Sequence, residues 1–158
     1  MSTHDSTVAH QLVAWDRMPV DHPAQGIERR MIWGDLLMIC RLRFDPHVVT
    51  AVHTHPHEHA AMLEEVYLYI DMPAPAFGVQ YVYTDRESPE IATFVREGDC
   101  VIIPQGYHPN VAAPGARIGF LWFMAAHREG LDRQFGVVNV QPEFAQQGSG
   151  LDQARERK

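Results

Sequence analysis

Short runs of alternating apolar and polar residues dominate the chain. The clearest run spans 36–44, where the apolar residues fall on one face and the arginines on the other: Met38, Cys40, Leu42 and Phe44 against Arg41 and Arg43. A period of two predicts a half-buried β-strand. Further strands are expected at 48–55, 65–70, 77–84, 91–95, 100–103, 117–125 and 137–140.

Turn residues separate these runs. Asp45-Pro46, the charged stretch 85–89, Glu97-Gly98-Asp99 and Pro104 each interrupt an apolar segment. Seven or eight short strands joined by such turns predict an all-β sandwich or barrel. We expect one domain at 26–141, preceded by a mobile polar segment at 1–25. The polar tail at 142–158 is expected to be disordered.

Composition narrows the function. A chain of 158 residues fits one domain. Its net charge of −7 argues against binding nucleic acid, because that binding requires neutralisation of phosphates. No apolar run approaches the ~20 residues of a membrane span, and the N-terminus lacks the apolar region of a signal peptide. We expect a cytoplasmic protein with a small-molecule partner. Cys40 and Cys100 are expected to be buried and reduced.

Four of the ten histidines lie between positions 53 and 59. On an extended strand His53 and His55 share a face, and imidazole nitrogens at that spacing bind divalent metals. His57 and His59 follow Pro56, which interrupts a strand, so their direction is less certain. A histidine-rich surface loop is the alternative interpretation. Two histidines hold a metal weakly, and Glu65 and His108 are candidates to complete the site.

The spacing of residues in two segments resembles the two sequence motifs of the cupin superfamily. Its first motif contains His-x-His followed by Glu, and its second reads G-x5-P-x-G followed by His. Gly98, Pro104, Gly106 and His108 match the second motif, with the histidine one residue earlier than usual. The resemblance implies a single RmlC-like jelly-roll β-barrel.

A more specific resemblance covers residues from about 30 to about 128. The segments HTHPHEH, LEEVYLYI, FGVQYVYTD, GDCVIIPQGYHP and LWFMAA occur in that order. They are similar to the family of 5-deoxy-glucuronate isomerase and 5-keto-4-deoxyuronate isomerase. Members of that family carry two cupin halves, and this chain resembles the C-terminal half only.

The resemblance implies a ligand set of His53, His55, Glu65 and His108. In generic small cupins the third ligand lies closer to the histidine pair, which would make His59 the ligand in place of Glu65. The long spacer favours Glu65. The implied cofactor is one divalent ion, with zinc preferred and manganese, iron or nickel as alternatives.

Strand parity extends the site. If Glu65 points inward, Tyr67 and Tyr69 do so too, and with Gln80 and Tyr83 they are expected to bind the substrate. For Gln80 an outward orientation is the alternative. The general base stays open: Tyr67 and Tyr107 are the leading candidates, and Tyr69, Tyr83, His57 and Glu58 are others.

The resemblance implies a metal-dependent aldose–ketose isomerase. Its substrate would be a deoxy-uronate such as 5-deoxy-glucuronate, in inositol catabolism. An Fe(II) dioxygenase and a non-catalytic sugar-binding cupin are the alternatives. Val66, Leu68 and Ile70 are expected to face outward, and such an apolar face predicts a homodimer.

Overall fold

The computed structural model describes residues 12–34, 36–46, 53–54, 63–128, 132 and 137–147. In these ranges the chain forms ten β-strands and two short 3-10 helices, and no α-helix. The predicted all-β class is therefore confirmed. A search of the described ranges also found no helix with the length and apolar character needed to cross a membrane.

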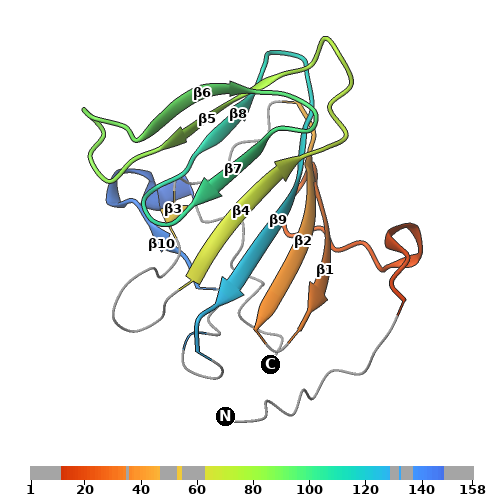
Figure 1. The fold of residues 1–158 in the computed structure, drawn as a ribbon. Helices are drawn as coiled ribbons and strands as arrows, with labels where there is room; N and C mark the ends of the chain where they lie inside the picture. Colours follow the sequence, from red (N-terminus) through yellow and green to blue (C-terminus); the bar gives the residue numbers. More distant parts are fainter. Residues whose placement is uncertain are drawn as a thin grey trace.

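A five-stranded antiparallel sheet forms one wall of the molecule (Figure 1). In spatial order its strands are β1 (Ile27–Trp33), β2 (Leu37–Phe44), β9 (Ile118–Ala126), β4 (Leu63–Tyr69) and β7 (Cys100–Ile103). The long apolar run expected at 117–125 becomes β9, which lies between β2 and β4. The most hydrophobic strand is thus the central one, where both of its edges are paired.

Smaller sheets lie beside this wall. The three-stranded sheet has the order β6 (Ile91–Val95), β5 (Gly78–Val82) and β8 (Asn110–Ala112). From β4 to β9 the chain enters the small sheet at β5 and β6, returns to the large sheet at β7, and repeats this exchange at β8 and β9. Such alternation between two antiparallel sheets is a jelly-roll arrangement.

The third pairing joins distant parts of the sequence. Strand β3 (His53–Thr54) pairs antiparallel with β10 (Asn139–Val140). The 3-10 helix η2 (Pro142–Gln147) follows β10, and the other 3-10 helix, η1 (Trp15–Arg17), precedes the large sheet. The segment after β9 therefore returns to pair with the strand that carries His53.

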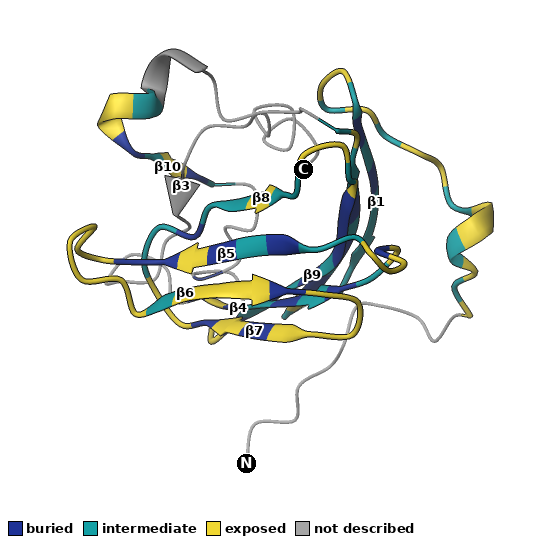
Figure 2. Cartoon of the chain, turned by 90° about the horizontal axis from the view of Figure 1, so that it is seen from above, coloured by how far each residue is buried: buried dark blue, intermediate teal, exposed yellow. Residues whose placement is uncertain are grey.

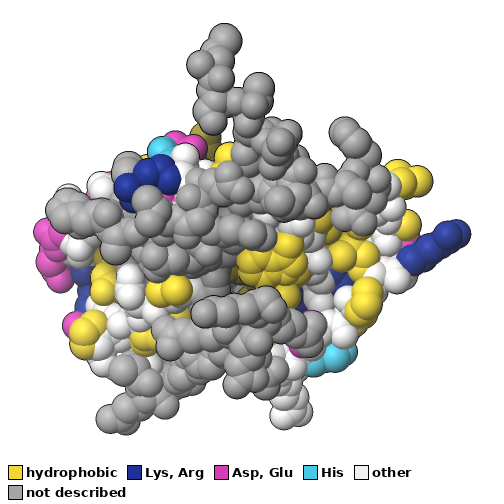
Figure 3. Space-filling view, turned by 90° about the horizontal axis from the view of Figure 1, so that it is seen from below, with side chains coloured by type: hydrophobic (Ala, Val, Ile, Leu, Met, Phe, Trp, Pro, Cys, Tyr) yellow, Lys and Arg dark blue, Asp and Glu magenta, His cyan; other side chains and the backbone are white. Residues whose placement is uncertain are grey.

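Side chains on the inner face of the large sheet form the core. Burial alternates along β2, β4 and β9, as Figure 2 shows by the change between dark blue and teal. Tyr67 of β4 stacks on Phe120 of β9 with ring centroids 4.5 Å apart. On the outside, β6 and β7 are the most open strands, with Phe94 59% and Ile102 68% exposed. Seen from below, several apolar side chains of the described residues are exposed at the surface (Figure 3).

Two features differ from the sequence-based expectations. Strand β1 was not predicted, and neither was β8. Cys40 is buried and reduced as expected, but Cys100 is exposed, so the prediction of two buried cysteines is wrong. The reason is parity: Cys100 lies opposite Leu68, which is on the outer face of β4.

The described residues before β1 contact the large sheet. Asp21 forms a backbone bridge with Arg29 and an ion pair with its guanidinium, which is 2% exposed. The predicted domain boundaries stay predictions, because residues 1–11 and 148–158 lie outside the described ranges.

Candidate functional site

Glu65 is the most unusual residue of the core. It occupies an inward position of β4 and is fully buried, whereas its neighbour Glu64 is exposed. The residues opposite it on the adjacent strands are Ile103 of β7 and Met124 of β9, which are fully buried too. The register therefore places a carboxyl group between two apolar side chains.

This environment disfavours the ionised form of Glu65. Burial raises the pKa of its carboxyl group from 4.5 to about 8, although the nearby side chains of Tyr67 and Trp122 lower it in part. Neither carboxyl oxygen has a hydrogen bond of regular geometry to the described residues. A buried carboxylate is stable only with a cation or hydrogen-bond donors beside it. A positive charge next to Glu65 would therefore stabilise its ionised form.

The side chain beside the Glu65 carboxyl group is that of His108. It lies in the turn after β7, is 3% exposed, and places Nε2 3.4 Å from Oε2 of Glu65. Its Nδ1 lies 2.9 Å from the carbonyl oxygen of Gly106. A carbonyl only accepts, so Nδ1 carries the proton, and in the neutral ring Nε2 presents its lone pair toward Glu65. This tautomer is the one that a metal ligand requires.

Gly106 is needed for this turn. Its φ is +95°, a left-handed conformation that glycine adopts without strain. A Cβ atom at this position would lie 2.8 Å from the carbonyl oxygen of Tyr83. The glycine of the PQGYHP segment thus permits the close approach to β5 that brings His108 inward.

The structure brings together two of the four predicted ligands, Glu65 and His108. The backbone of His53 lies in β3, but its side chain and the whole of His55 lie outside the described residues. The same holds for the alternative ligand His59, and for His57 and Glu58. In the described ranges no group of three or more His, Cys, Asp or Glu side chains lies together. The ligand set therefore stays a prediction.

The predicted inward orientation of Tyr67 and Tyr69 is confirmed, because both are buried in the core. The ring of His108 meets the ring of Tyr67 edge-on at 5.8 Å. Burial, and then the charge of Glu65, raise the pKa of Tyr67 well above its usual value. At neutral pH this phenol is protonated, so it donates hydrogen bonds.

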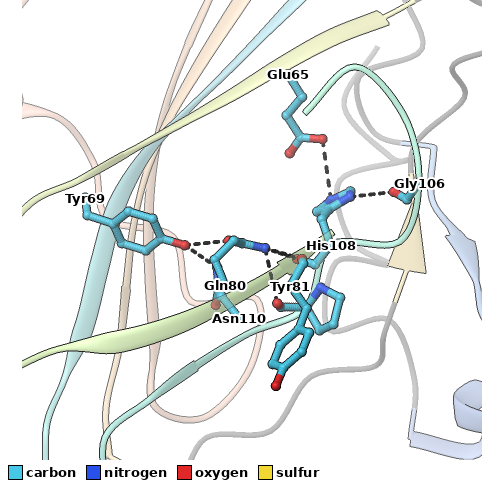
Figure 4. A network of polar contacts seen from close by, with 8 residues as sticks. Glu65, Tyr69, Gln80, Tyr81, Gly106, His108 and Asn110 are labelled. Atoms are coloured by element: carbon cyan, nitrogen blue, oxygen red, sulfur yellow. Dashed lines mark hydrogen bonds and ion pairs between the residues drawn. The ribbon is translucent and has the colours of Figure 1, made fainter. Parts of the chain in front are cut away.

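Tyr69 and Gln80 form a buried network beside His108 (Figure 4). Gln80 is fully buried, which excludes the outward orientation. The hydroxyl of Tyr69 donates to Oε1 of Gln80 at 2.5 Å and accepts from Nδ2 of Asn110 at 3.4 Å. Nε2 of Gln80 donates toward the carbonyl oxygen of His108 at 3.0 Å.

Tyr83 and Tyr107 lie beside each other in the segments that flank Gln80 and His108. They form an antiparallel backbone bridge, and their ring centroids are 5.7 Å apart. The hydroxyl of Tyr83 donates to Oε1 of Gln141 at 2.6 Å, and burial raises the pKa of this phenol. Gln141 directly follows β10, so this bond fastens the C-terminal segment over β5.

Sequence reasoning did not single out Asn110, Trp122 or Gln141. Trp122 lies opposite Tyr67 in the register of β4 and β9, so parity along the apolar run would have placed it inward. Asn110 and Gln141 contact the site through pairings between distant segments, for which the sequence carries no local signal.

Similar proteins carry isomerase names. The profile of the KduI/IolB family matches residues 48–143. The 5-deoxy-glucuronate isomerase of Geobacillus thermodenitrificans is 44% identical over 73 residues, which are 46% of this chain and 26% of that protein. The enzyme of the same name from Lacticaseibacillus casei is 29% identical over 135 residues, which are 77% and 50% of the two chains. This chain thus spans at most about half the length of these two relatives.

The fold also has counterparts among solved structures. An RmlC-like cupin from Shewanella frigidimarina has a TM-score of 0.50 at 15% identity, covering 82% of this chain and 97% of that one. At this identity the likeness concerns the fold alone. Together with the exchange of strands between two sheets, it confirms the predicted single cupin jelly-roll barrel.

Proposed function

Because this chain belongs to the KduI/IolB family, we propose that it is a sugar-acid isomerase that depends on a divalent metal ion. The observation that carries the proposal is the buried pair of Glu65 and His108. Their side chains meet at one end of the barrel, although β5, β6 and β7 separate them in the chain.

The residues present fit a metal ion. A carboxyl group with two buried oxygens, neither in a regular hydrogen bond to the described residues, suits a cation better than it suits the apolar side chains around it. The Nδ1 bond of His108 to Gly106 leaves Nε2 as the ligand atom on the side of Glu65. Glu65 and His108 would hold the ion, together with His53 and His55 from the predicted set. Zinc is the first choice, since it is commonly bound by nitrogen and carboxylate ligands.

The proposed reaction is an aldose–ketose interconversion of a deoxy-uronate such as 5-deoxy-glucuronate, in inositol catabolism. When bound, a divalent ion supplies Lewis-acid polarisation of a carbonyl oxygen, which acidifies the neighbouring C–H. A base on the protein then moves one proton between two adjacent carbons. Tyr67 and Tyr107 are the candidates for this proton transfer. The raised pKa of Tyr67 makes it a donor at neutral pH, so it suits the protonation half of the step.

The substrate would lie against the tyrosines at the same end of the barrel. Tyr67, Tyr69, Gln80 and Tyr83 are the proposed substrate contacts. Tyr67 and Tyr69 line the inner face of β4, and Tyr83 follows β5. Phenol hydroxyls offer both donors and acceptors to sugar hydroxyls, which supports a polyhydroxylated ligand.

The direct test is ketose formation from 5-deoxy-glucuronate, followed by NMR, with and without EDTA. Elemental analysis of the purified protein should find about one metal ion per chain. Glu65→Gln and His108→Ala should each lose metal and activity, while Glu64→Gln, at the exposed neighbouring position, should keep both. Stoichiometric metal in His108→Ala would show that the ligand set is wrong.

Two other outcomes would replace this function. Oxygen consumption with Fe(II), without ketose formation, would identify a dioxygenase. Binding of a sugar acid by a protein without metal would identify a non-catalytic binding module.

We also propose that the protein is a homodimer. One apolar residue on each strand forms a row across the outer face of the large sheet: Ile32, Ile39, Phe123, Val66 and Ile102. A row of this kind favours burial against a second subunit. Light scattering should give the mass of two chains, and Ile102→Glu should lower it. A monomer at micromolar concentration would refute the dimer.

A further inference from the structure

Gln80 forms hydrogen bonds with the backbone of the segment that carries His108. Its side chain lies on the inner face of β5 and contacts the segment that carries His108 (Figure 4). We propose that Gln80 is a positioning residue: it replaces the missing N–H of Pro109 and fixes the backbone from which the His108 ring faces Glu65. The inference rests on the proposed function in treating His108 as a metal ligand.

The ladder between β5 and the segment before β8 is incomplete at Pro109. Tyr83 lies opposite Tyr107, and the antiparallel register then places Tyr81 opposite Pro109. Tyr83 and Tyr107 exchange two N–H···O bonds of 2.9 Å. Tyr81 donates its N–H to the carbonyl of Pro109 at 3.0 Å, but proline has no N–H to return. The carbonyl of Tyr81 therefore lacks its ladder donor.

The amide of Gln80 supplies this donor. Its Nε2 lies 2.6 Å from the carbonyl oxygen of Tyr81, the acceptor that Pro109 cannot satisfy. The same nitrogen lies 3.0 Å from the carbonyl of His108 and 3.1 Å from that of Pro109. An amide nitrogen has two hydrogens, so three carbonyls already share them.

The orientation of the amide follows from its surroundings. Three carbonyl oxygens can only accept, so the nitrogen of Gln80 must face them and its oxygen must face elsewhere. That oxygen accepts from the hydroxyl of Tyr69 at 2.5 Å. The bonds of Gln80 to Tyr69 and to the carbonyl of His108 are buried, so the loss of either would leave an unsatisfied polar atom. The amide is therefore held in one orientation.

This arrangement constrains His108 at two points. Gln80 holds its backbone carbonyl, and the carbonyl of Gly106 holds Nδ1 of its ring. These two contacts fix the backbone position of His108 and the orientation of its imidazole ring, whose Nε2 lies 3.4 Å from Oε2 of Glu65. Metal–ligand distances tolerate deviations of only about 0.2 Å, so a shift of this segment would weaken the site.

The test compares zinc affinity in wild-type protein and Gln80→Met. Methionine keeps the length of the side chain and removes its hydrogen bonds. Competition with a chromophoric chelator should show binding about 10- to 100-fold weaker in Gln80→Met, the usual effect of losing a group that orients a ligand. Tyr69→Phe, which removes the contact to the Gln80 oxygen and keeps the donors, should give a smaller loss.

Asp21→Asn is the matched control for stability. It weakens the ion pair with the buried Arg29 on β1, which lies at the opposite edge of the large sheet from β7. This variant should melt at a lower temperature with unchanged zinc affinity. Equal zinc affinity in Gln80→Met and wild type would overturn the inference. An equal loss in Asp21→Asn would overturn it as well, because the effect would then follow stability alone. Gln80→Glu, which keeps the length of the side chain, replaces Gln80→Met if the latter does not fold.

A second measurement separates this inference from the proposed function. In EDTA-treated protein at fixed pH, nitrogen NMR of the imidazoles should show His108 protonated at Nδ1 alone, with His108→Ala assigning the signal. Gln80→Met should show a mixture of tautomers. If the wild type bound no zinc, the metal dependence would fail, and this comparison would still decide the role of Gln80. An unchanged tautomer in Gln80→Met would then refute it.

Discussion

The carboxyl group of Glu65 makes the stability of the metal-free protein depend on pH. Burial between Ile103 and Met124 raises its pKa from 4.5 to about 8 in the folded state. Between these two values the folded protein keeps the proton and the unfolded chain has lost it. The free energy of unfolding therefore falls as the pH rises through this window, and the contribution is fully present only below pH 4.5.

The size of the effect follows from proton linkage. One proton of difference corresponds to about 1.4 kcal/mol per pH unit. From pH 5.5 to 7.5 the Glu65 contribution should fall by roughly 2–3 kcal/mol, slightly less than the full slope because the upper limit approaches the folded-state pKa. Glu65→Gln has no titrating group at this position and should lose this part of the pH dependence.

Urea unfolding in EDTA, followed by tryptophan fluorescence, measures this difference at pH 5.5, 6.5 and 7.5. The quantity to compare is the difference in free energy of unfolding between Glu65→Gln and wild type, because the other titrating groups cancel in it. From pH 5.5 to 7.5 the free energy of unfolding of Glu65→Gln should rise relative to that of wild type by roughly 2–3 kcal/mol. Glu64→Gln, at the exposed position beside it, should follow the wild-type profile. Parallel profiles for wild type and Glu65→Gln would refute the buried, protonated carboxyl.

Three further predictions concern the turn, the cysteines and the C-terminal segment. Iodoacetamide should modify the exposed Cys100 in native protein and spare the buried Cys40, whose pKa burial raises further, as mass spectrometry of peptides would show; equal labelling would contradict the packing of β2. Gly106→Ala should lower the free energy of unfolding by about 1–3 kcal/mol, measured by urea titration, since its φ is +95° and its Cβ would meet Tyr83. Tyr83→Phe should cost about 1–3 kcal/mol by leaving the Gln141 oxygen without its donor; wild-type stability would show that water replaces the phenol.

Local pattern sufficed for the strands with clear boundaries. The ranges expected at 91–95 and 100–103 are those of β6 and β7, because a charged turn and Pro104 mark their ends. Strand β1 escaped prediction because Arg29 and Arg30 interrupt its alternation. Arg29 is buried through its ion pair with Asp21, a contact that no periodicity reveals.

The parts of the site that depend on the alternation of side chains along one strand were predictable. The parts that depend on the pairing between strands were not. Tyr67 and Tyr69 lie inward, as expected from Glu65, because one strand carries all three. The orientation of Gln80 stayed open at the sequence level, since its burial depends on pairing with β8, a strand of three residues. The meeting of Glu65 with His108 was expected because two histidines alone hold a metal weakly, and the family resemblance implied the same pair. His53 and His55 stay predictions.

The position of Glu65 shows how stability and function oppose each other in this barrel. The adjacent inward positions are apolar, and a carboxyl group among them costs free energy whenever it is ionised without a cation. The bond between Nδ1 of His108 and the carbonyl of Gly106 selects the tautomer in which Nε2, on the side of Glu65, can bind a metal ion. A site of this kind gains most from binding a metal ion, because the ion offsets the cost that burial imposes on the ionised carboxyl group.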